Sequence, residues 1–124
     1  MDKENSKRHP LERFHHCPMC GSGHFEASSE KSKKCRDCGF EFFLNSAAAT
    51  VAIIEDGHGR VLVTRRANNP AKGTLDLPGG FCDHGESAER GVVREVMEET
   101  GLRVTDVRYL FSLPNVYPYS GLDI

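Results

Sequence analysis

The order of apolar and polar positions changes several times along the chain, and each change predicts a different element. The β-branched run Thr50–Ile54 is short and nearly continuous in apolar residues, which is typical of a buried strand. A second strand is expected over Arg60–Arg66, and Gly57-His58-Gly59 between the two runs predicts a hairpin. Thr74–Leu77 is expected to be a short extended piece, followed by a turn at Pro78-Gly79-Gly80.

A helical pattern covers Ser87–Thr100, and Gly101 is expected to end the helix with Leu102 as an apolar cap contact. Its apolar face is made by Val92, Val93, Val96 and Met97. At about 100° per residue, the carboxylates fall within one arc of about 100°, centred roughly 130° from the apolar face. These carboxylates belong to Glu95, Glu98 and Glu99. We expect the apolar face to pack on a sheet and the acidic face to point outward.

The acidic face of this helix needs a compensating cation, because like charges one turn apart repel. Clustered carboxylate oxygens attract hard divalent ions such as Mg²⁺ or Mn²⁺. Arg94 precedes Glu98 by four residues and is expected to pair with it or with its neighbours. Gly91 and Ala88 lie on the same side, and a mid-helix glycine costs about 1 kcal/mol relative to alanine. The missing side chains are therefore expected to serve the close approach of a ligand.

Beyond the helix, Arg103–Thr105 and Val107–Ser112 are strand-like, and Leu113–Gly121 is a loop rich in proline and tyrosine. One helix and a few strands would leave one face of an α/β sheet uncovered. We therefore expect this chain to be the front part of a longer protein.

Four of the five cysteines form two C-x-x-C pairs, Cys17/Cys20 and Cys35/Cys38, each followed by glycine. In a reducing compartment this spacing predicts a structural Cys₄ zinc site rather than disulfides. Such a closed site leaves no position open for chemistry, so its role is to fold a small module. Cys82 is interpreted as a small half-buried side chain rather than a nucleophile.

These patterns divide the chain into a flexible tail over residues 1–14, a zinc ribbon over 15–44 and a larger α/β domain over 45–124. The 16 Lys and Arg nearly balance the 18 Asp and Glu, and a net charge of −2 gives no global field for nucleic acid or an anionic membrane. Lys31, Lys33, Lys34 and Arg36 form a small basic group in the ribbon, so local nucleic-acid binding stays an alternative to a solvated surface.

No stretch approaches the roughly 18 apolar residues of a membrane helix, and the N-terminus lacks the apolar core of a signal peptide. No membrane partner is therefore expected, and a cytoplasmic location is the default expectation.

The stretch Gly80–Leu102 resembles the Nudix box, G-x5-E-x7-R-E-U-x-E-E-x-G-U, in which U is aliphatic. The matching residues are Gly80, Glu86, Arg94-Glu95-Val96, Glu98-Glu99 and Gly101-Leu102. The resemblance implies a Nudix hydrolase with an α/β/α sandwich around a mixed sheet. Such an enzyme cleaves a nucleoside diphosphate linked to another moiety, by attack of water on phosphorus with the help of divalent metal.

Carried over to this chain, the resemblance implies that Glu95 and Glu99 bind the metal directly and that the Gly79 carbonyl adds a further contact. Glu98 is implied as a ligand or as the base that activates water, and the sequence does not choose between Glu95 and Glu98 for that base. Glu86 and Arg94 are implied to brace the loop against the helix.

A zinc ribbon before a Nudix domain resembles the NADH pyrophosphatase-like branch, whose signature S-Q-P-W-P-F-P-x-S follows the box. The corresponding stretch here is Ser112–Ser120, in which Leu113, Asn115 and Val116 depart from the signature. The expected substrates are therefore a dinucleotide or nucleotide sugar of the NADH or ADP-ribose kind. Members of this branch are often dimers, so a homodimer is one expected partner. The alternative function is a non-catalytic Nudix module that senses a nucleotide, with a ribbon that binds nucleic acid or a partner.

Overall fold

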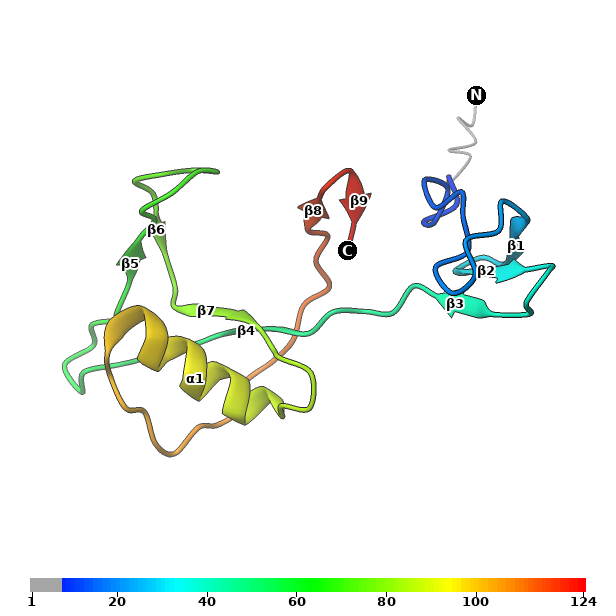
Figure 1. Cartoon of the computed structure of the whole chain (residues 1–124). Helices are drawn as coiled ribbons and strands as arrows, with labels where there is room; N and C mark the ends of the chain where they lie inside the picture. Colours follow the sequence, from blue (N-terminus) through cyan, green and yellow to red (C-terminus); the bar gives the residue numbers. More distant parts are fainter. Residues whose placement is uncertain (1–7) are drawn as a thin grey trace, which may run out of the picture. The chain divides into compact units, whose positions relative to one another are not determined.

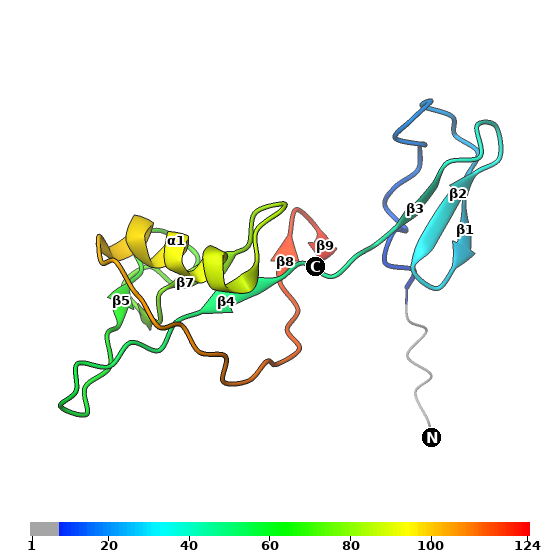
Figure 2. The same cartoon turned by 90° about the horizontal axis from the view of Figure 1, so that it is seen from below.

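The computed structural model describes residues 8–124, which Figures 1 and 2 show from two sides. The chain forms two compact units. One unit contains the described residues up to Ser46 together with Pro114–Ile124, and the other is Ala47–Leu113. Within residues 8–124, no helix is long and apolar enough to cross a membrane.

The ribbon is a three-stranded antiparallel sheet in the order β1-β2-β3. Its strands are β1 (Phe25–Ser29), β2 (Ser32–Cys35) and β3 (Glu41–Phe43). Its core is small: Cys17, Phe25 and Cys35 are buried, and Phe14, Phe40 and Phe42 pack against them. So few buried apolar side chains supply little stability by themselves, because a very small domain buries little of its apolar surface.

Residues 8–14 fall within the predicted flexible tail, yet they lie on the ribbon. Leu11 is fully buried, and the Phe14 ring lies 6.0 Å from the Phe42 ring between centroids. His9 Nε2 lies 2.8 Å from the Ser29 carbonyl oxygen. Residues 1–7 of the predicted tail lie outside the described residues. From residue 9 onward the segment thus supplies part of the ribbon's small core.

The second unit begins with two short antiparallel strand pairs. In the first pair, β4 (Ala49–Val51) pairs with β7 (Gly79–Phe81), with Thr50 opposite Gly80. In the second pair, β5 (Thr64–Arg65) pairs with β6 (Leu75–Asp76). The predicted turn at Pro78-Gly79-Gly80 is therefore wrong, since its glycines belong to a strand. The small glycines let β7 lie closely against its neighbours.

The hairpin predicted around Gly57-His58-Gly59 is confirmed. An isolated bridge joins Glu55 to Val61, and the Leu62 N–H donates to the Ile54 carbonyl over 2.9 Å. The strands on either side are shorter than the sequence predicted.

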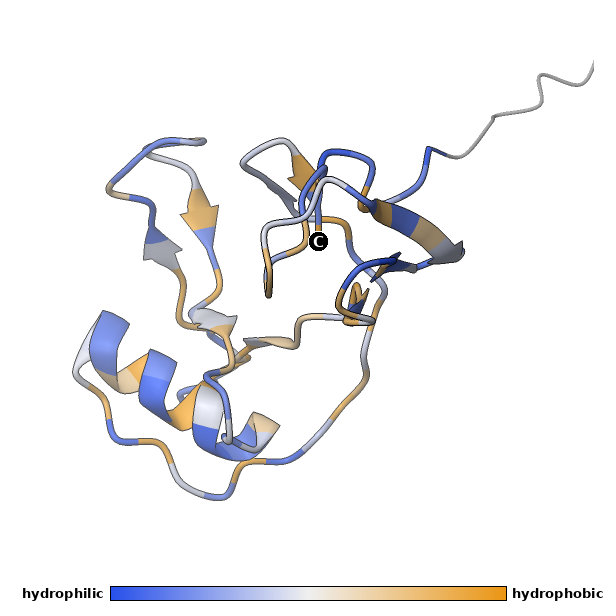
Figure 3. Cartoon of the chain, turned by 45° about the vertical axis from the view of Figure 1, so that its right-hand side comes forward, coloured by the Kyte–Doolittle hydropathy of each residue, from blue (hydrophilic) through white to orange (hydrophobic). Residues whose placement is uncertain are grey.

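Helix α1 (Ala88–Thr100) confirms the predicted span to within a residue. The Ser87 hydroxyl accepts the Arg90 N–H at the start, and left-handed Gly101 (φ 74°) ends the helix. The helix packs on β4 and β7, and Figure 3 shows hydrophilic and hydrophobic turns alternating along it. The buried residues are Gly91, Val92 and Val96.

The predicted separation of an apolar face from an outward acidic face is partly wrong. Met97 is 39% exposed, whereas the Glu95 side chain is only 17% exposed and lies against β7. The helix is rotated toward its acidic side because Gly80 gives Glu95 room. A Cβ at Gly80 would lie 2.7 Å from the Glu95 carboxyl carbon.

The sequence suggested that Gly91 leaves space for a ligand, and this prediction is wrong. Its Cα faces Cys82, and a Cβ there would lie 2.8 Å from the Cys82 sulfur. Gly91 is buried and Cys82 half-buried, so the pair forms one contact between the helix and the box loop, which is residues 82–87 between β7 and α1. The interpretation of Cys82 as a small packing residue agrees with this contact.

The strands predicted over Arg103–Thr105 and Val107–Ser112 are wrong, because no strand lies there in the described chain. Apolar side chains of this segment are exposed, including Phe111 at 65%. A strand needs a partner for its backbone hydrogen bonds, and neither the β4-β7 sheet nor the β5-β6 sheet includes this segment. Two further short strands, β8 (Pro118–Tyr119) and β9 (Leu122–Asp123), form a hairpin at the end of the predicted loop.

The Gly91–Cys82 contact predicts a rescue experiment. Gly91→Ala should destabilise the Ala47–Leu113 unit by about 1–3 kcal/mol, because the new methyl overlaps the Cys82 sulfur. Adding Cys82→Ala should restore most of that loss, since a Cβ at residue 91 would then meet the residue 82 Cβ and the Glu86 Oε1, each at 3.5 Å, which is ordinary contact. Hydrogen exchange of α1 amides would measure both variants, with Cys82→Ala alone as the control. A double variant as unstable as Gly91→Ala would contradict this packing.

Candidate functional site

The centre of the acidic site is the Arg94 guanidinium, which bonds to carboxylates from both the box loop and the helix. Its Nε and Nη2 donate to the two Glu86 oxygens over 2.8 and 2.9 Å. Its Nη1 donates to Glu95 over 2.9 Å and to Glu98 over 3.2 Å, and Asp83 lies 3.3 Å from Nε. One cation therefore offsets several like charges whose mutual repulsion would otherwise open the site.

The Arg94–Glu86 contact is bidentate and mostly shielded, with side-chain exposures of 26% and 18%. The Arg94 hydrogen bonds, followed by the Asp83 N–H, lower the pKa of Glu86 to about 2. Hydrogen bonds to Glu86 and then to Glu95 raise the pKa of Arg94. Arg94 Nη2 also donates to the Phe81 carbonyl over 3.1 Å, which fixes the guanidinium to the end of β7.

Two of the helix carboxylates, those of Glu95 and Glu99, also lie against β7. The Gly79 N–H donates to Glu99 Oε2 over 3.3 Å, and Glu95 occupies the space above Gly80. The Thr50 hydroxyl donates to the Gly80 carbonyl over 3.3 Å and holds this strand from its other side. The structure thus brings Glu95 and Glu99 to β7, where Glu99 contacts the backbone of residue 79, whereas Glu98 contacts Arg94.

The carboxylate oxygens of Glu95, Glu98 and Glu99 do not converge on one point. Among residues 8–124, only the four cysteines form a group whose ligand atoms are all close together. Arg94 draws Glu95 and Glu98 toward itself, whereas Glu99 contacts Gly79. The set of hard oxygen donors within two helical turns nevertheless matches what Mg²⁺ or Mn²⁺ prefers.

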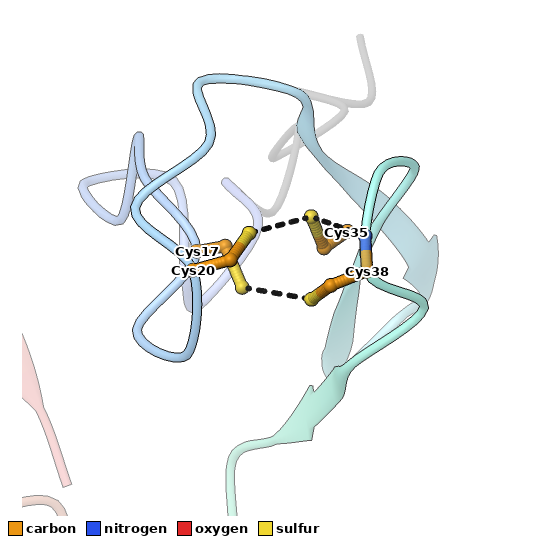
Figure 4. A group of neighbouring side chains, drawn as sticks. All are labelled: Cys17, Cys20, Cys35 and Cys38. Atoms are coloured by element: carbon orange, nitrogen blue, oxygen red, sulfur yellow. Dashed lines mark hydrogen bonds between the residues drawn. The ribbon is translucent and has the colours of Figure 1, made fainter.

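The cysteine cluster in the ribbon has the geometry of a closed metal site (Figure 4). The ligand atoms of Cys17, Cys20, Cys35 and Cys38 all lie within 4.8 Å of one another. Sulfurs of opposite pairs lie 3.6 Å apart, Cys17 from Cys38 and Cys20 from Cys35. Zn–S bonds of about 2.3 Å in a tetrahedron give S···S separations of about 3.8 Å, which these distances match.

The pKa values of three of the thiols, those of Cys20, Cys35 and Cys38, depart from the ordinary value. The Cys38 N–H lowers the pKa of Cys35 to about 6. The Ser22 N–H lowers the pKa of Cys20, but the Cys35 hydrogen bond and desolvation outweigh it and raise that pKa to about 12. Neighbouring thiolates resist a shared negative charge, so a bound dication is what would let all four ionise.

Of the basic group predicted in the ribbon, Lys33 is buried in the fold and Arg36 makes a surface ion pair. Lys33 is 8% exposed, and its ammonium donates to the Phe14 carbonyl over 2.7 Å and lies 5.9 Å from the Phe25 ring centroid. Arg36 pairs with Glu26 over 3.4 Å.

Sequence reasoning missed one carboxylate of the acidic site and one contact beside it. Asp83 contributes a further carboxylate to Arg94, and Cys82 fixes the box loop against Gly91. Asp83 lies three residues before Glu86 in a loop that must turn back toward the helix, which was a usable signal. No signal in the sequence indicated that Cys82 contacts Gly91, because a glycine within a helix gives no information about the side chain that packs on it.

The chain is similar in sequence to several known proteins. The model of the NUDIX domain matches residues 45–124. An ADP-ribose pyrophosphatase of Methanocaldococcus jannaschii is 42% identical over 93 residues, which are 73% of this chain and 54% of that protein. The NAD-capped RNA hydrolase NudC of Haemophilus influenzae is 30% identical over 115 residues, which are 92% of this chain and 44% of that protein. The chain thus spans about half the length of these curated relatives.

A solved structure, a NUDIX hydrolase from Nitrosomonas europaea, superposes with a TM-score of 0.59 at 26% identity. The match covers 67% of this chain and 49% of that one. The family drawn from the box motif is thereby confirmed, as is its fold class, although the described residues hold only one helix of the sandwich. By its domain match, its relatives and the arrangement of its box residues, the chain belongs to the Nudix family.

Proposed function

We propose that this chain carries the catalytic core of a metal-dependent pyrophosphohydrolase. The substrate would be a nucleoside diphosphate linked to another moiety, of the dinucleotide or ADP-ribose class. The observation that carries the proposal is the Arg94-centred cluster, in which Glu86, Glu95 and Glu98 share one guanidinium. Beside it, Glu99 accepts the Gly79 N–H. The relatives named for ADP-ribose and NAD-capped RNA support the substrate class.

In this proposal, Glu95, Glu98 and Glu99 hold Mg²⁺ or Mn²⁺ together with the Gly79 carbonyl. Bound there, the metal would neutralise phosphate oxygens and lower the pKa of an attacking water. Positioning and charge neutralisation supply most of the rate enhancement in such phosphorus chemistry. The donor set supports this assignment, because hard oxygen ligands suit these ions.

The remaining residues would orient the carboxylates and move a proton. Arg94 fixes Glu95 and Glu98 while Glu86 fixes Arg94, so the loop and helix keep their relative positions. The base that accepts the water's proton is Glu98 or Glu95. Glu98 is the better placed of the two, since its side chain is 58% exposed and meets solvent, against 17% for Glu95.

We also propose that the ribbon binds one structural zinc through Cys17, Cys20, Cys35 and Cys38. The sulfur distances near 3.6 Å and the small apolar core support this proposal. With every position filled by protein, zinc would stabilise the fold and take no part in hydrolysis.

The metal-ligand role of Glu99 predicts a loss of activity with little loss of stability. Glu99→Gln should reduce turnover of ADP-ribose by at least ~100-fold, since even outer partners of a metal site account for about 10–100-fold. Glutamine keeps an oxygen for the Gly79 N–H, so the free energy of unfolding should change by less than about 0.5 kcal/mol. The control is Glu89→Gln, another exposed glutamate of α1. Equal turnover in the two variants, or unchanged Mn²⁺ affinity in Glu99→Gln, would remove Glu99 from the site.

Zinc content tests the ribbon proposal independently of activity. Cys35→Ser should lose the metal and the hydrogen-exchange protection of β1 to β3, because the apolar core is too small to hold the sheet. Cys82→Ser, at the cysteine outside the cluster, should retain equimolar zinc. Elemental analysis of purified protein measures both. Full zinc content in Cys35→Ser would refute the assignment.

The lowered pKa of Glu86 predicts a pH dependence of the acidic site. The shift from an ordinary value of 4.5 to about 2 means that its contribution is fully present above about pH 4.5 and lost as the pH falls toward about 2. Hydrogen-exchange protection of α1, corrected for intrinsic rates, should therefore fall across this window. Glu86→Gln should show weaker protection at neutral pH and a smaller fall, and Glu89→Gln the full one. An identical fall in Glu86→Gln would show that this carboxylate is not the group that titrates.

A further inference from the structure

A small polar cluster joins the two C-x-x-C segments, here called the knuckles (Cys17–Cys20 and Cys35–Cys38). Neither the acidic site nor the metal ligands account for it. Ser22 and His24 follow the first knuckle, whereas Asp37 lies inside the second one. The Ser22 hydroxyl donates to Asp37 Oδ2, and His24 Nδ1 lies 2.9 Å from the same oxygen. A carboxylate only accepts hydrogen bonds, so the imidazole N–H is the donor. Two donors from one knuckle thus meet one acceptor from the other.

The backbone ties this cluster to the cysteines. The Cys17 N–H donates to the Ser22 carbonyl over 2.8 Å, and the Arg36 N–H donates to the His24 carbonyl over 2.9 Å. The Ser22 hydroxyl oxygen also accepts the His24 N–H over 3.0 Å. Movement of either knuckle would therefore disturb the side-chain contacts directly.

The same gap is spanned by the sulfur contacts. The Cys17–Cys38 and Cys20–Cys35 pairs, each 3.6 Å apart, run from one knuckle to the other. A bound metal can leave only when sulfurs of opposite knuckles separate. Any bond between the knuckles that does not involve sulfur opposes that separation.

We propose that Ser22, His24 and Asp37, here named the knuckle clasp, position the two cysteine pairs and slow the loss of zinc. The inference rests on the zinc site proposed above and adds positioning residues to it. Outer partners of metal ligands typically change metal affinity by about 10–100-fold, and this clasp is solvent-exposed, so we expect the lower end, about tenfold.

The rate of zinc release from the full chain tests the clasp. Zinc-loaded protein is mixed with excess chelator, and release is followed with a metal-sensitive dye. Asp37→Ala removes the shared acceptor and should release zinc about tenfold faster than the wild type. Asp37→Asn keeps an oxygen that can accept from both Ser22 and His24, so its rate should stay close to that of the wild type.

The matched control is Glu26→Gln. The Arg36–Glu26 pair has side-chain exposures of 71% and 56%, nearly those of His24 and Asp37 at 70% and 54%. It joins the second knuckle to β1 rather than to the first knuckle, so breaking it should leave the release rate unchanged. Cobalt-substituted Asp37→Ala should keep the absorption of a four-thiolate site, because all its ligands remain.

Several outcomes would overturn the clasp. A wild-type rate in Asp37→Ala would remove its role, and an Asp37→Asn rate as fast as Asp37→Ala would assign the effect to charge. If Asp37→Ala fails to fold, Ser22→Ala decides, since it removes only one donor; a rate between those of wild type and tenfold faster supports the clasp, and a wild-type rate refutes it. A wild-type chain that contains no zinc would instead refute the zinc site itself, and the clasp with it.

Discussion

The acidic site depends on the hydrogen bonds that the Arg94 guanidinium donates. They reach Glu86 in the loop on one side, and Glu95 and Glu98 in the helix on the other. Without this cation, like charges on neighbouring turns would push the side chains apart and away from β7. The same contacts fix the loop to the helix, so one residue organises both the local fold and the proposed metal ligands.

The ribbon follows a similar logic with different chemistry. Four sulfurs that resist a common negative charge are held together by two knuckles and a very small apolar core. In both units the fold brings groups of like charge near one another: carboxylates, which would suit a hard ion, and cysteine sulfurs, which would suit zinc in a closed site. The carboxylate group suits the proposed catalysis, and the cysteine group suits the proposed structural role.

The sequence predicted those features that depend on residues close together in the chain. The helix, its end at Gly101 and the cysteine cluster were all predicted from caps, periodicity and spacing. Features that depend on distant partners were not. The pairing of β7 with β4 joins segments far apart in the chain, and the Gly91–Cys82 contact was instead interpreted as space for a ligand. Lys33 looked like free surface charge, although its ammonium is bonded to a carbonyl from a segment predicted to be flexible.

The central claim is that the acidic cluster supports attack of water on the phosphorus of a pyrophosphate. Hydrolysis of ADP-ribose in ¹⁸O-labelled water with Mg²⁺, followed by mass spectrometry of the products, tests it most directly. The account predicts AMP and ribose 5-phosphate, with a single ¹⁸O atom in a phosphate group of one of them. Products without label in phosphate, or the same product yield when the metal is chelated, would contradict it.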